Sequence, residues 1–143
     1  MAQQYVIRVK QCPGKNLVLA VLGNTLVQAT YVQGDKTQLW TLELNQWKNG
    51  DNLIAAYSII NVGNGLAAKW NGGGQPIIVA TNVLNDQTFC WRLDSVGGGY
   101  YAINRWDGGE VMDVKGDNCD PGTVILAYGW NGGDNQRWRI DAA

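Results

Sequence analysis

The chain has 143 residues, which suffices for one domain with its own hydrophobic core. Its formal net charge is −1, from 11 Lys and Arg against 12 Asp and Glu, which argues against a partner that is nucleic acid or an anionic membrane surface. Nineteen glycines, seven tryptophans and only three prolines favour short strands joined by tight turns over helices.

The start of the chain does not resemble a targeting segment. Met1–Tyr5 is polar and lacks the basic and apolar regions of a signal peptide. The longest wholly apolar run, Leu17–Leu22, has six residues, whereas a membrane-spanning helix needs roughly 20. We therefore expect a cytoplasmic protein without membrane insertion. Cys12, Cys90 and Cys119 are odd in number and scattered, so we expect free thiols.

Three short patterns recur along the chain in the same order, which indicates an internal repeat. They are Tyr-x-Ile from Tyr5, Tyr57 and Tyr101, an apolar run ending at Thr30, Thr81 and Tyr128, and Trp-x-Leu/Ile from Trp40, Trp91 and Trp138. The second and third markers are ten residues apart in every copy, and the tryptophans recur at intervals of 51 and 47 residues. Fixed spacing among three markers therefore predicts three copies of one unit.

Each copy consists of short alternating runs broken by Gly, Asn and Asp, which predicts about four strands and no long helix. One such unit cannot bury its apolar face alone, so we expect the three to pack around a pseudo-threefold axis. The three tryptophans recur in every copy and are therefore predicted to lie in the core. Gln38 and Gln136, two residues before a tryptophan, are expected to bond backbone or polar groups of the adjacent turn.

Gln-x-Trp near the end of a unit of about 50 residues resembles the ricin-B-type (R-type) lectins, which are β-trefoils. The run Asn131–Trp138 is especially similar to fungal members, whereas the first copy keeps only Gln38-Leu-Trp40 and the second has Phe89 for the glutamine. The resemblance implies an all-β β-trefoil with pseudo-threefold symmetry, as a single lectin domain at 1–143. Its repeats would span about 1–50, 51–96 and 97–143.

The third copy alone carries the groups that a sugar requires, an aromatic plate for the C–H face and polar groups for the hydroxyls. Tyr128 would be the plate, although a tyrosine packed on its own turn is the alternative. Asp113 could accept hydrogen bonds from two neighbouring hydroxyls, because an ionised carboxylate is purely a hydrogen-bond acceptor. A turn aspartate that caps backbone N–H groups is the plainer interpretation. Asn135 can both donate and accept.

Further roles are expected around these three residues. The resemblance implies that the aspartate and the asparagine contact the sugar and that Gln136 braces Asp113, and the residue types indicate the others. Gly116 would offer a backbone N–H where a side chain would obstruct the ligand, and Asn131 is a weaker candidate. Trp130 would widen the aromatic platform or simply pack. Lys115 replaces the small residue expected there, and it would either clash with the ligand or extend the site.

The corresponding positions in the other two copies lack these groups. The first copy has Ala20, Thr30 and Thr37, and the second has Lys69, Thr81 and Thr88. One site per chain is therefore expected. An atypical site in the first copy, at Tyr31 and Asp35, is left open.

Three other functions are weighed against sugar binding. The chain has no histidine and no phosphate-loop motif, and no acid pair stands out as a glycosidase centre, so an enzyme is not expected, nor are a cofactor, a metal or a catalytic residue. A β-trefoil protease inhibitor acting through one exposed loop is the main alternative. An actin-bundling-type structural trefoil would not need a chemically distinct third copy.

The sequence therefore predicts a lectin for terminal galactose or N-acetylgalactosamine. Its partners would be glycans of glycoproteins or glycolipids. A homodimer is expected, because one site per chain cannot agglutinate cells as a monomer.

Overall fold

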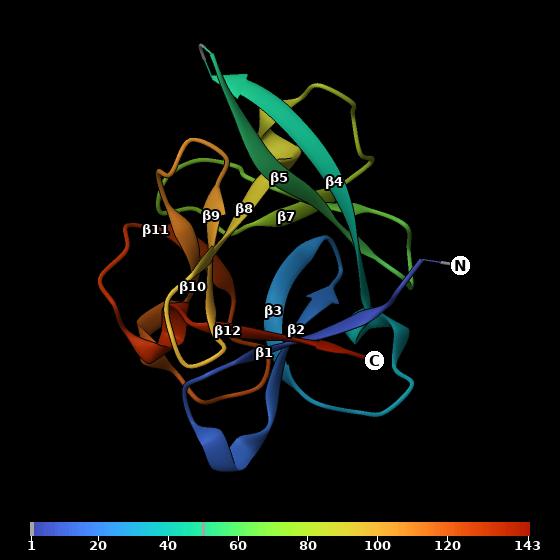
Figure 1. Cartoon of the computed structure of the whole chain (residues 1–143). Coiled ribbons are helices and arrows are strands. Elements are labelled where there is room, and N and C mark those ends of the chain that lie inside the picture. Colours follow the sequence, from blue (N-terminus) through green and yellow to red (C-terminus); the bar gives the residue numbers. More distant parts are fainter. Residues whose placement is uncertain (1, 50) are drawn as a thin grey trace.

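The computed structural model describes residues 2–49 and 51–143, which form twelve strands connected by tight turns (Figure 1). The strands are β1 (Tyr5–Val9), β2 (Leu17–Leu22), β3 (Thr25–Thr30), β4 (Trp40–Asn49), β5 (Asn52–Asn61), β6 (Ala67–Lys69), β7 (Ile78–Ala80), β8 (Trp91–Ser95), β9 (Tyr101–Arg105), β10 (Val111–Val114), β11 (Ile125–Tyr128) and β12 (Trp138–Ala142). They fall into three sets of four, as the repeat predicts.

The helices of the described chain are single 3-10 turns of three residues. They are η1 (Pro13–Lys15), η2 (Lys36–Gln38), η3 (Gln87–Phe89), η4 (Lys115–Asp117) and η5 (Asp134–Gln136). Three of them, η2, η3 and η5, end two residues before a repeated tryptophan and thus occupy equivalent places. Across the described residues, no helix has the length and apolar character needed to cross a bilayer.

Six strands close into a barrel, because each repeat contributes its first and last strand. Antiparallel pairing runs from β1 to β4, β5, β8, β9 and β12, and β12 pairs with β1 again. Closure removes the unpaired edges that an open sheet would leave. The three Tyr-x-Ile motifs lie in β1, β5 and β9, so each is part of the first barrel strand of its repeat.

The remaining six strands form three hairpins, β2–β3, β6–β7 and β10–β11. Backbone contacts join each hairpin to the other two. Thr25 pairs with Ile78, Val27 bridges Val124, and Pro76 bridges Leu126. This arrangement of a barrel with a triplet of hairpins is the β-trefoil architecture predicted from the repeat.

The core depends on the three repeated tryptophans. Trp40, Trp91 and Trp138 are fully buried, and their indole N–H groups donate to backbone carbonyls in the second strand of their own repeats. The acceptors are Leu19 O at 3.0 Å, Ala68 O at 3.0 Å and Met112 O at 3.1 Å. These acceptors directly precede Ala20, Lys69 and Asp113, so the structure independently supports the alignment of those three positions. The predicted core role of the tryptophans is confirmed.

One hairpin departs from the threefold pattern. β4 and β5 have ten residues each, whereas β8 and β9 have five, and the longer ribbon projects from the body of the molecule (Figure 1). The ribbon is therefore the most prominent feature that the symmetry does not explain.

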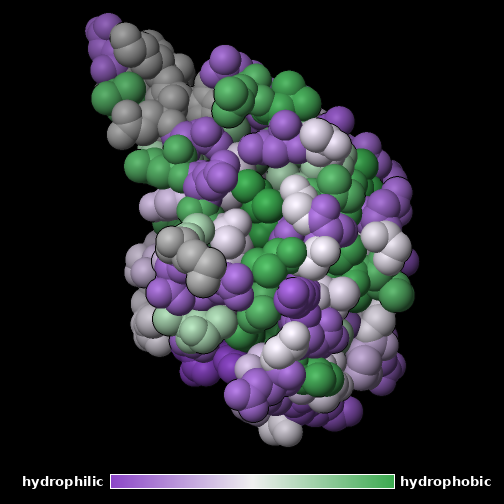
Figure 2. All heavy atoms as spheres, turned by 90° about the vertical axis from the view of Figure 1, so that its right-hand side faces the viewer, coloured by the Kyte–Doolittle hydropathy of each residue, from purple (hydrophilic) through white to green (hydrophobic). Residues whose placement is uncertain are grey.

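On the face that carries the two chain ends, apolar and polar side chains are interspersed (Figure 2).

The expectation of three free thiols is wrong. Cys12 and Cys119 form a disulfide with a Cα–Cα distance of 6.0 Å, and Cys90, which is not part of this disulfide, is buried. The pair is 107 residues apart in the sequence, so spacing could not reveal it. Tertiary packing brings the two together, because the loop at 115–123 lies against β3 of the first repeat.

A buried polar clasp accompanies the disulfide. Gln28 Nε2 donates to the carbonyl oxygens of Asn118 and Asp120 at 2.6 and 2.9 Å, and Gln11 Nε2 also donates to Asn118 O at 2.9 Å. The backbone of Gln28 adds two bonds to the same loop, to Thr123 and from Gly122. The first repeat therefore holds the loop that follows β10 of the third repeat.

Candidate functional site

The outer face of hairpin β10–β11 carries an open pocket of about 430 Å³. It is lined by Asp113, Lys115, Gly116, Asp117, Leu126, Tyr128, Asn131 and Asn135. Five of the six residues predicted to bind a ligand thus share one pocket. The sixth, Gln136, is fully buried and bonds to Asp113 from behind.

Strand register explains why these side chains meet. Asp113 pairs with Leu126 and Val111 with Tyr128, and directly paired residues of antiparallel strands point to the same face. The alternate residues, among them Met112 and Ile125, are fully buried in the core. Tyr128 is 53% exposed, so it presents its ring to the pocket opening and does not pack into the protein.

Asp113 is a buried carboxylate inside a strand, only 5% exposed. Burial raises its pKa above the ordinary value of 3.8, and the negative charge of Asp117 raises it further. Hydrogen bonding from the Gln136 and Asn135 amides acts in the opposite direction and lowers the pKa. Asp113 accepts from a side chain and is not the turn cap of the plainer interpretation.

Gln136 fixes the carboxylate to the turn after β11. Its Nε2 donates to Asp113 Oδ2 at 2.7 Å and to Gly129 O at 2.8 Å, and its Oε1 accepts from Asn131 N at 2.8 Å. Both amide protons are thus used. The brace implied by the family resemblance is present, and the expected bonding of Gln136 to its turn is confirmed.

The residues equivalent to Asn135 in the other two repeats are threonines that bond to an aspartate of the same turn. In the first repeat Asp35 accepts from the backbone N–H and the hydroxyl of Thr37, at 3.0 and 2.7 Å. Asp86 does the same for Thr88 in the second repeat, at 3.0 and 2.6 Å. The third repeat has Gly133 and Asn135 at these two positions. The capping pair is therefore absent from the repeat that carries Asp113 and Tyr128.

The exchange of the capping aspartate for glycine makes room for the Asn135 amide. A Cβ at Gly133 would lie 2.5 Å from Asn135 Oδ1 and 3.0 Å from Asn131 Oδ1. Asn135 Nδ2 donates to Val114 O at 3.1 Å, whereas its buried Oδ1 has no partner among the described residues. A buried acceptor without a partner is costly, and Asn135 is only 5% exposed. The amide is thus held at the pocket wall with an unused acceptor.

Gly116 and Asn131 shape the rim of the pocket. Gly116 has φ +66°, a left-handed conformation that suits glycine, and it turns the chain directly after β10. Asn131 Oδ1 accepts from Gly133 N at 2.8 Å, so this side chain first of all stabilises its own turn. Lys115 lines the pocket and is exposed. Trp130 does not line it and lies 5.2 Å from the Arg137 guanidinium, which favours the packing alternative.

Two residues that line the pocket were not predicted from the sequence. Leu126 belongs to the apolar run of the second marker, which every copy shares, and it was therefore expected only as scaffold. The strand alternation places it on the outer face beside Tyr128, and that alternation could have identified it. Asp117 follows Gly116 in the turn, and no sequence pattern distinguishes it from an ordinary turn aspartate.

Within the described residues, the other two repeats have no pocket with the same set of groups. Ala20 is buried in the first repeat, and in the second the Lys69 ammonium lies 5.5 Å from the Phe89 ring, so a cation–aromatic pair replaces the carboxylate and glutamine. A pocket of about 390 Å³ in the first repeat includes Asp35 but not Tyr31. The Tyr31 ring lies 4.7 Å from the Arg8 guanidinium instead. The structure does not bring these two candidates into one site.

No group of three or more His, Cys, Asp or Glu side chains within residues 2–49 and 51–143 is placed to hold a metal ion.

Solved structures with the same fold include single-domain and larger proteins. The designed 3-fold symmetric protein ThreeFoil matches with a TM-score of 0.80 at 23% identity, over 98% of this chain and 99% of its own. A mosquitocidal holotoxin matches with a TM-score of 0.84 at 22% identity, over 100% of this chain but 17% of its own. The Macrolepiota procera ricin B-like lectin, solved in complex with lactose, matches with a TM-score of 0.76 at 19% identity, over 99% and 96%.

No curated protein matches the chain. The family model described as "Ricin-type beta-trefoil lectin domain-like" matches residues 36–128 and 89–143, which together extend over most of the sequence. The chain belongs to the ricin-type β-trefoil lectin family.

Proposed function

We propose that this protein is a carbohydrate-binding lectin that holds a terminal galactose or N-acetylgalactosamine in the pocket of its third repeat. The observation that carries the proposal is the buried Asp113–Gln136 pair beneath an exposed Tyr128. The first two repeats share the scaffold but not this combination. Membership of a lectin family supports the carbohydrate class of ligand.

The proposed roles follow from the chemistry of each group. Tyr128 would stack on the C–H face of the sugar, as an aromatic ring on an otherwise polar rim allows. Asp113 would accept hydrogen bonds from two neighbouring hydroxyls, since Gln136 occupies only part of its acceptor capacity. Asn135, whose side chain lines the pocket, would contact a further hydroxyl. Gly116 and Asn131 would border the ligand.

A protein of the same fold supports the galactose type of ligand. The Macrolepiota procera lectin, which shares the fold, was solved with lactose, a galactoside. One open pocket of this kind is expected to bind a monosaccharide with a dissociation constant on the order of 0.1–1 mM. Useful binding to a cell surface would then require several sites.

Binding without catalysis is part of the proposal. Of the two carboxylates that line the pocket, Asp113 is buried and accepts from Gln136, and Asp117 lies in the exposed turn that follows β10. A glycosidase needs two carboxyl groups flanking the scissile bond. A protease inhibitor would leave the buried carboxylate and its brace without a use. Failure to bind galactose-agarose combined with inhibition of papain or trypsin would favour that alternative.

One site per chain leads to a homodimer, through which a lectin could cross-link glycans. Sedimentation velocity should show a dimer in any preparation that agglutinates cells. A monomer that agglutinates would mean a second sugar site.

Replacing Asp113 by alanine should weaken galactose binding roughly 10- to 150-fold, corresponding to about 1.5–3 kcal/mol for a lost hydrogen bond to a charged group. Tyr128→Ala should weaken it comparably. Calorimetric titration of each variant measures this. Thr30→Ala, at the position equivalent to Tyr128, is the matched control and should bind like the parent protein. Unchanged binding by Asp113→Ala, with the fold intact by circular dichroism, would refute the site.

Sugar affinity should fall on acidification at a higher pH than an ordinary aspartate predicts. Because burial raises the pKa of Asp113, its carboxylate is protonated earlier as the pH falls and loses acceptor capacity. The same raised pKa means that Asp113 makes the fold less stable as the pH rises through it. Asp113→Asn should therefore be at least as stable as the parent protein at neutral pH. Binding by the parent that stays constant down to the ordinary aspartate range would contradict the pKa assignment.

Gly133→Ala should disturb the pocket without touching a sugar directly. The added Cβ would clash with Asn135 Oδ1, and overpacking of this kind typically costs about 1–3 kcal/mol. Urea denaturation and galactose titration measure the two effects. Gly129→Ala is the control, because a Cβ there meets no atom within 4 Å. Equal behaviour of the two variants would show that Gly133 is not needed to seat Asn135.

A further inference from the structure

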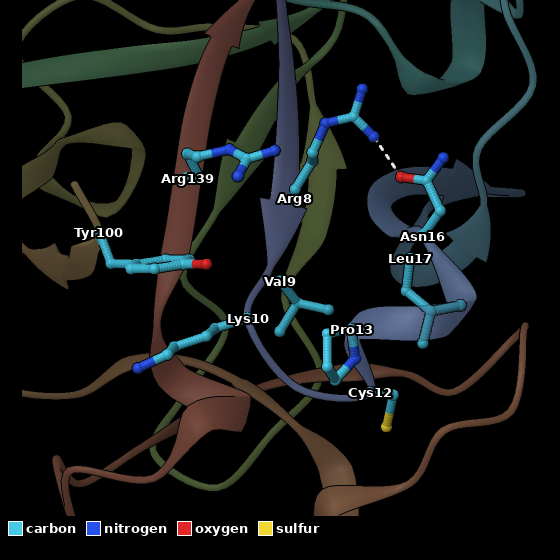
Figure 3. Close-up of a pocket in the computed structure, with 9 residues that line it drawn as sticks. All are labelled: Arg8, Val9, Lys10, Cys12, Pro13, Asn16, Leu17, Tyr100 and Arg139. Carbon is cyan, nitrogen blue, oxygen red and sulfur yellow. Dashed lines mark hydrogen bonds between the residues drawn. The ribbon is translucent and has the colours of Figure 1, made fainter. Parts of the chain in front are cut away.

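A smaller pocket lies between β1, β12 and the turn before β2, and its lining is basic (Figure 3). It has a volume of about 110 Å³ and is lined by Arg8, Val9, Lys10, Cys12, Pro13, Asn16, Leu17, Tyr100 and Arg139. The two arginines rise side by side from neighbouring strands, and the Tyr100 ring lies below Arg139 with Lys10 beneath it (Figure 3). The lining thus contains three cations and no carboxylate.

Strand register places two of these cations directly opposite each other. Arg8 pairs with Arg139, and like charges in this position destabilise a sheet. Asp141 is the acid between them, and its Oδ2 accepts from Arg8 Nε at 3.2 Å and from Arg139 Nε at 2.9 Å. One carboxylate therefore serves two guanidinium groups, which leaves one positive charge unbalanced.

The excess charge continues along the same ribbon. Lys10 and Arg137 follow on the same face and share Asp134, at 3.6 and 4.0 Å. Four cations and two carboxylates give this ribbon an excess of two positive charges (4 − 2), in a chain whose net charge is −1.

The equivalent junction between the second and third repeats shows that the fold does not require this excess. There Arg92 takes the place of Arg139, but its partner across the strands is Asn104. Arg92 and Asn104 both donate to Asp94, so one cation meets one anion. At the junction of the first two repeats, Thr41 pairs with Ile60 and no charge is involved.

The arginines retain unused donors. A guanidinium has five N–H groups. Arg139 donates only through Nε within the described chain, and Arg8 donates through Nε and through Nη1, the latter to Asn16. Donors with fixed geometry and an unbalanced charge are the features by which proteins recognise sulfate and phosphate groups. The pocket is about a quarter of the size of the one at Asp113, so it suits one charged group and not a whole sugar ring.

We propose that the pocket formed by Arg8, Lys10, Arg139 and Tyr100 binds a tetrahedral oxyanion, sulfate or phosphate, carried by a saccharide. The saccharide part rests on the proposed lectin function, whereas the oxyanion part rests on the charges and donors of the pocket alone. Lys10 supplies a point charge, the arginines supply directed N–H donors, and the Tyr100 hydroxyl supplies an O–H donor.

The test is an NMR titration of backbone amides at constant ionic strength, in the Asp113→Ala background that removes the proposed sugar site. Galactose 6-sulfate and galactose 6-phosphate should each cause saturable shifts around Arg8, Lys10, Tyr100 and Arg139, and galactose should not. The ester with the stronger effect identifies the oxyanion. Inorganic sulfate is titrated alongside the two esters. Saturation by inorganic sulfate but by neither ester would overturn the saccharide assignment.

Arg8→Asn, which copies the balanced junction at Asn104, should weaken the response about tenfold or more through the loss of charged donors. Arg139→Gln should act in the same direction. Arg92→Gln is the matched control, because it removes the same charge at the equivalent strand position and should leave the titration unchanged. Identical shifts in Arg8→Asn and its parent would overturn the proposal. Because every variant carries Asp113→Ala, this result is independent of whether galactose binds to the third repeat.

Discussion

The hydrogen bond from each repeated tryptophan to the second strand of its own repeat is the constraint on which the rest of the structure depends. A fully buried indole N–H without a partner would cost roughly 1–3 kcal/mol. The acceptor is always a backbone carbonyl, so its side chain is free to vary, and it does vary among Leu19, Ala68 and Met112. The next residue points to the opposite face of the strand. The same bond that fixes the core therefore leaves Ala20, Lys69 and Asp113 free to differ.

This separation of scaffold and surface explains how one copy could acquire a polar pocket without disturbing the fold. In the first two repeats an aspartate and a threonine stabilise the turn before the tryptophan. In the third, Gly133 and Asn135 replace them. Gln136 bonds to its turn, as Gln38 does in the first repeat, and it also donates to Asp113. The changes belong together, because a side chain at Gly133 would occupy the space of the Asn135 amide.

Features that recur in all three copies, or that differ within a single alignment column, could be predicted from the sequence. The barrel, the core tryptophans and the grouping of Asp113, Tyr128 and Asn135 are of this kind. Contacts between segments far apart in the sequence could not. The Cys12–Cys119 disulfide spans 107 positions, and Arg8 reaches Asp141 across 133. Arg8 and Asp141 meet because β1 pairs with β12, and the two cysteines meet because the loop at 115–123 lies against β3. Leu126 was missed for a different reason, since apolar composition concealed the strand alternation that exposes it.

The hydrogen bonds and the disulfide that join the first repeat to the third decide whether the third repeat could form the pocket on its own. All the polar groups of the pocket at Asp113 come from the third repeat, which invites the view of that repeat as a self-contained binding unit. Yet the loop at 115–123, which supplies one wall of the pocket, is tied to Gln11, Cys12 and Gln28 near the start of the chain. The pocket is therefore a property of the closed ring and not of one module. A third repeat excised from its neighbours would retain the chemical groups of the pocket but lose the anchor of one of its walls.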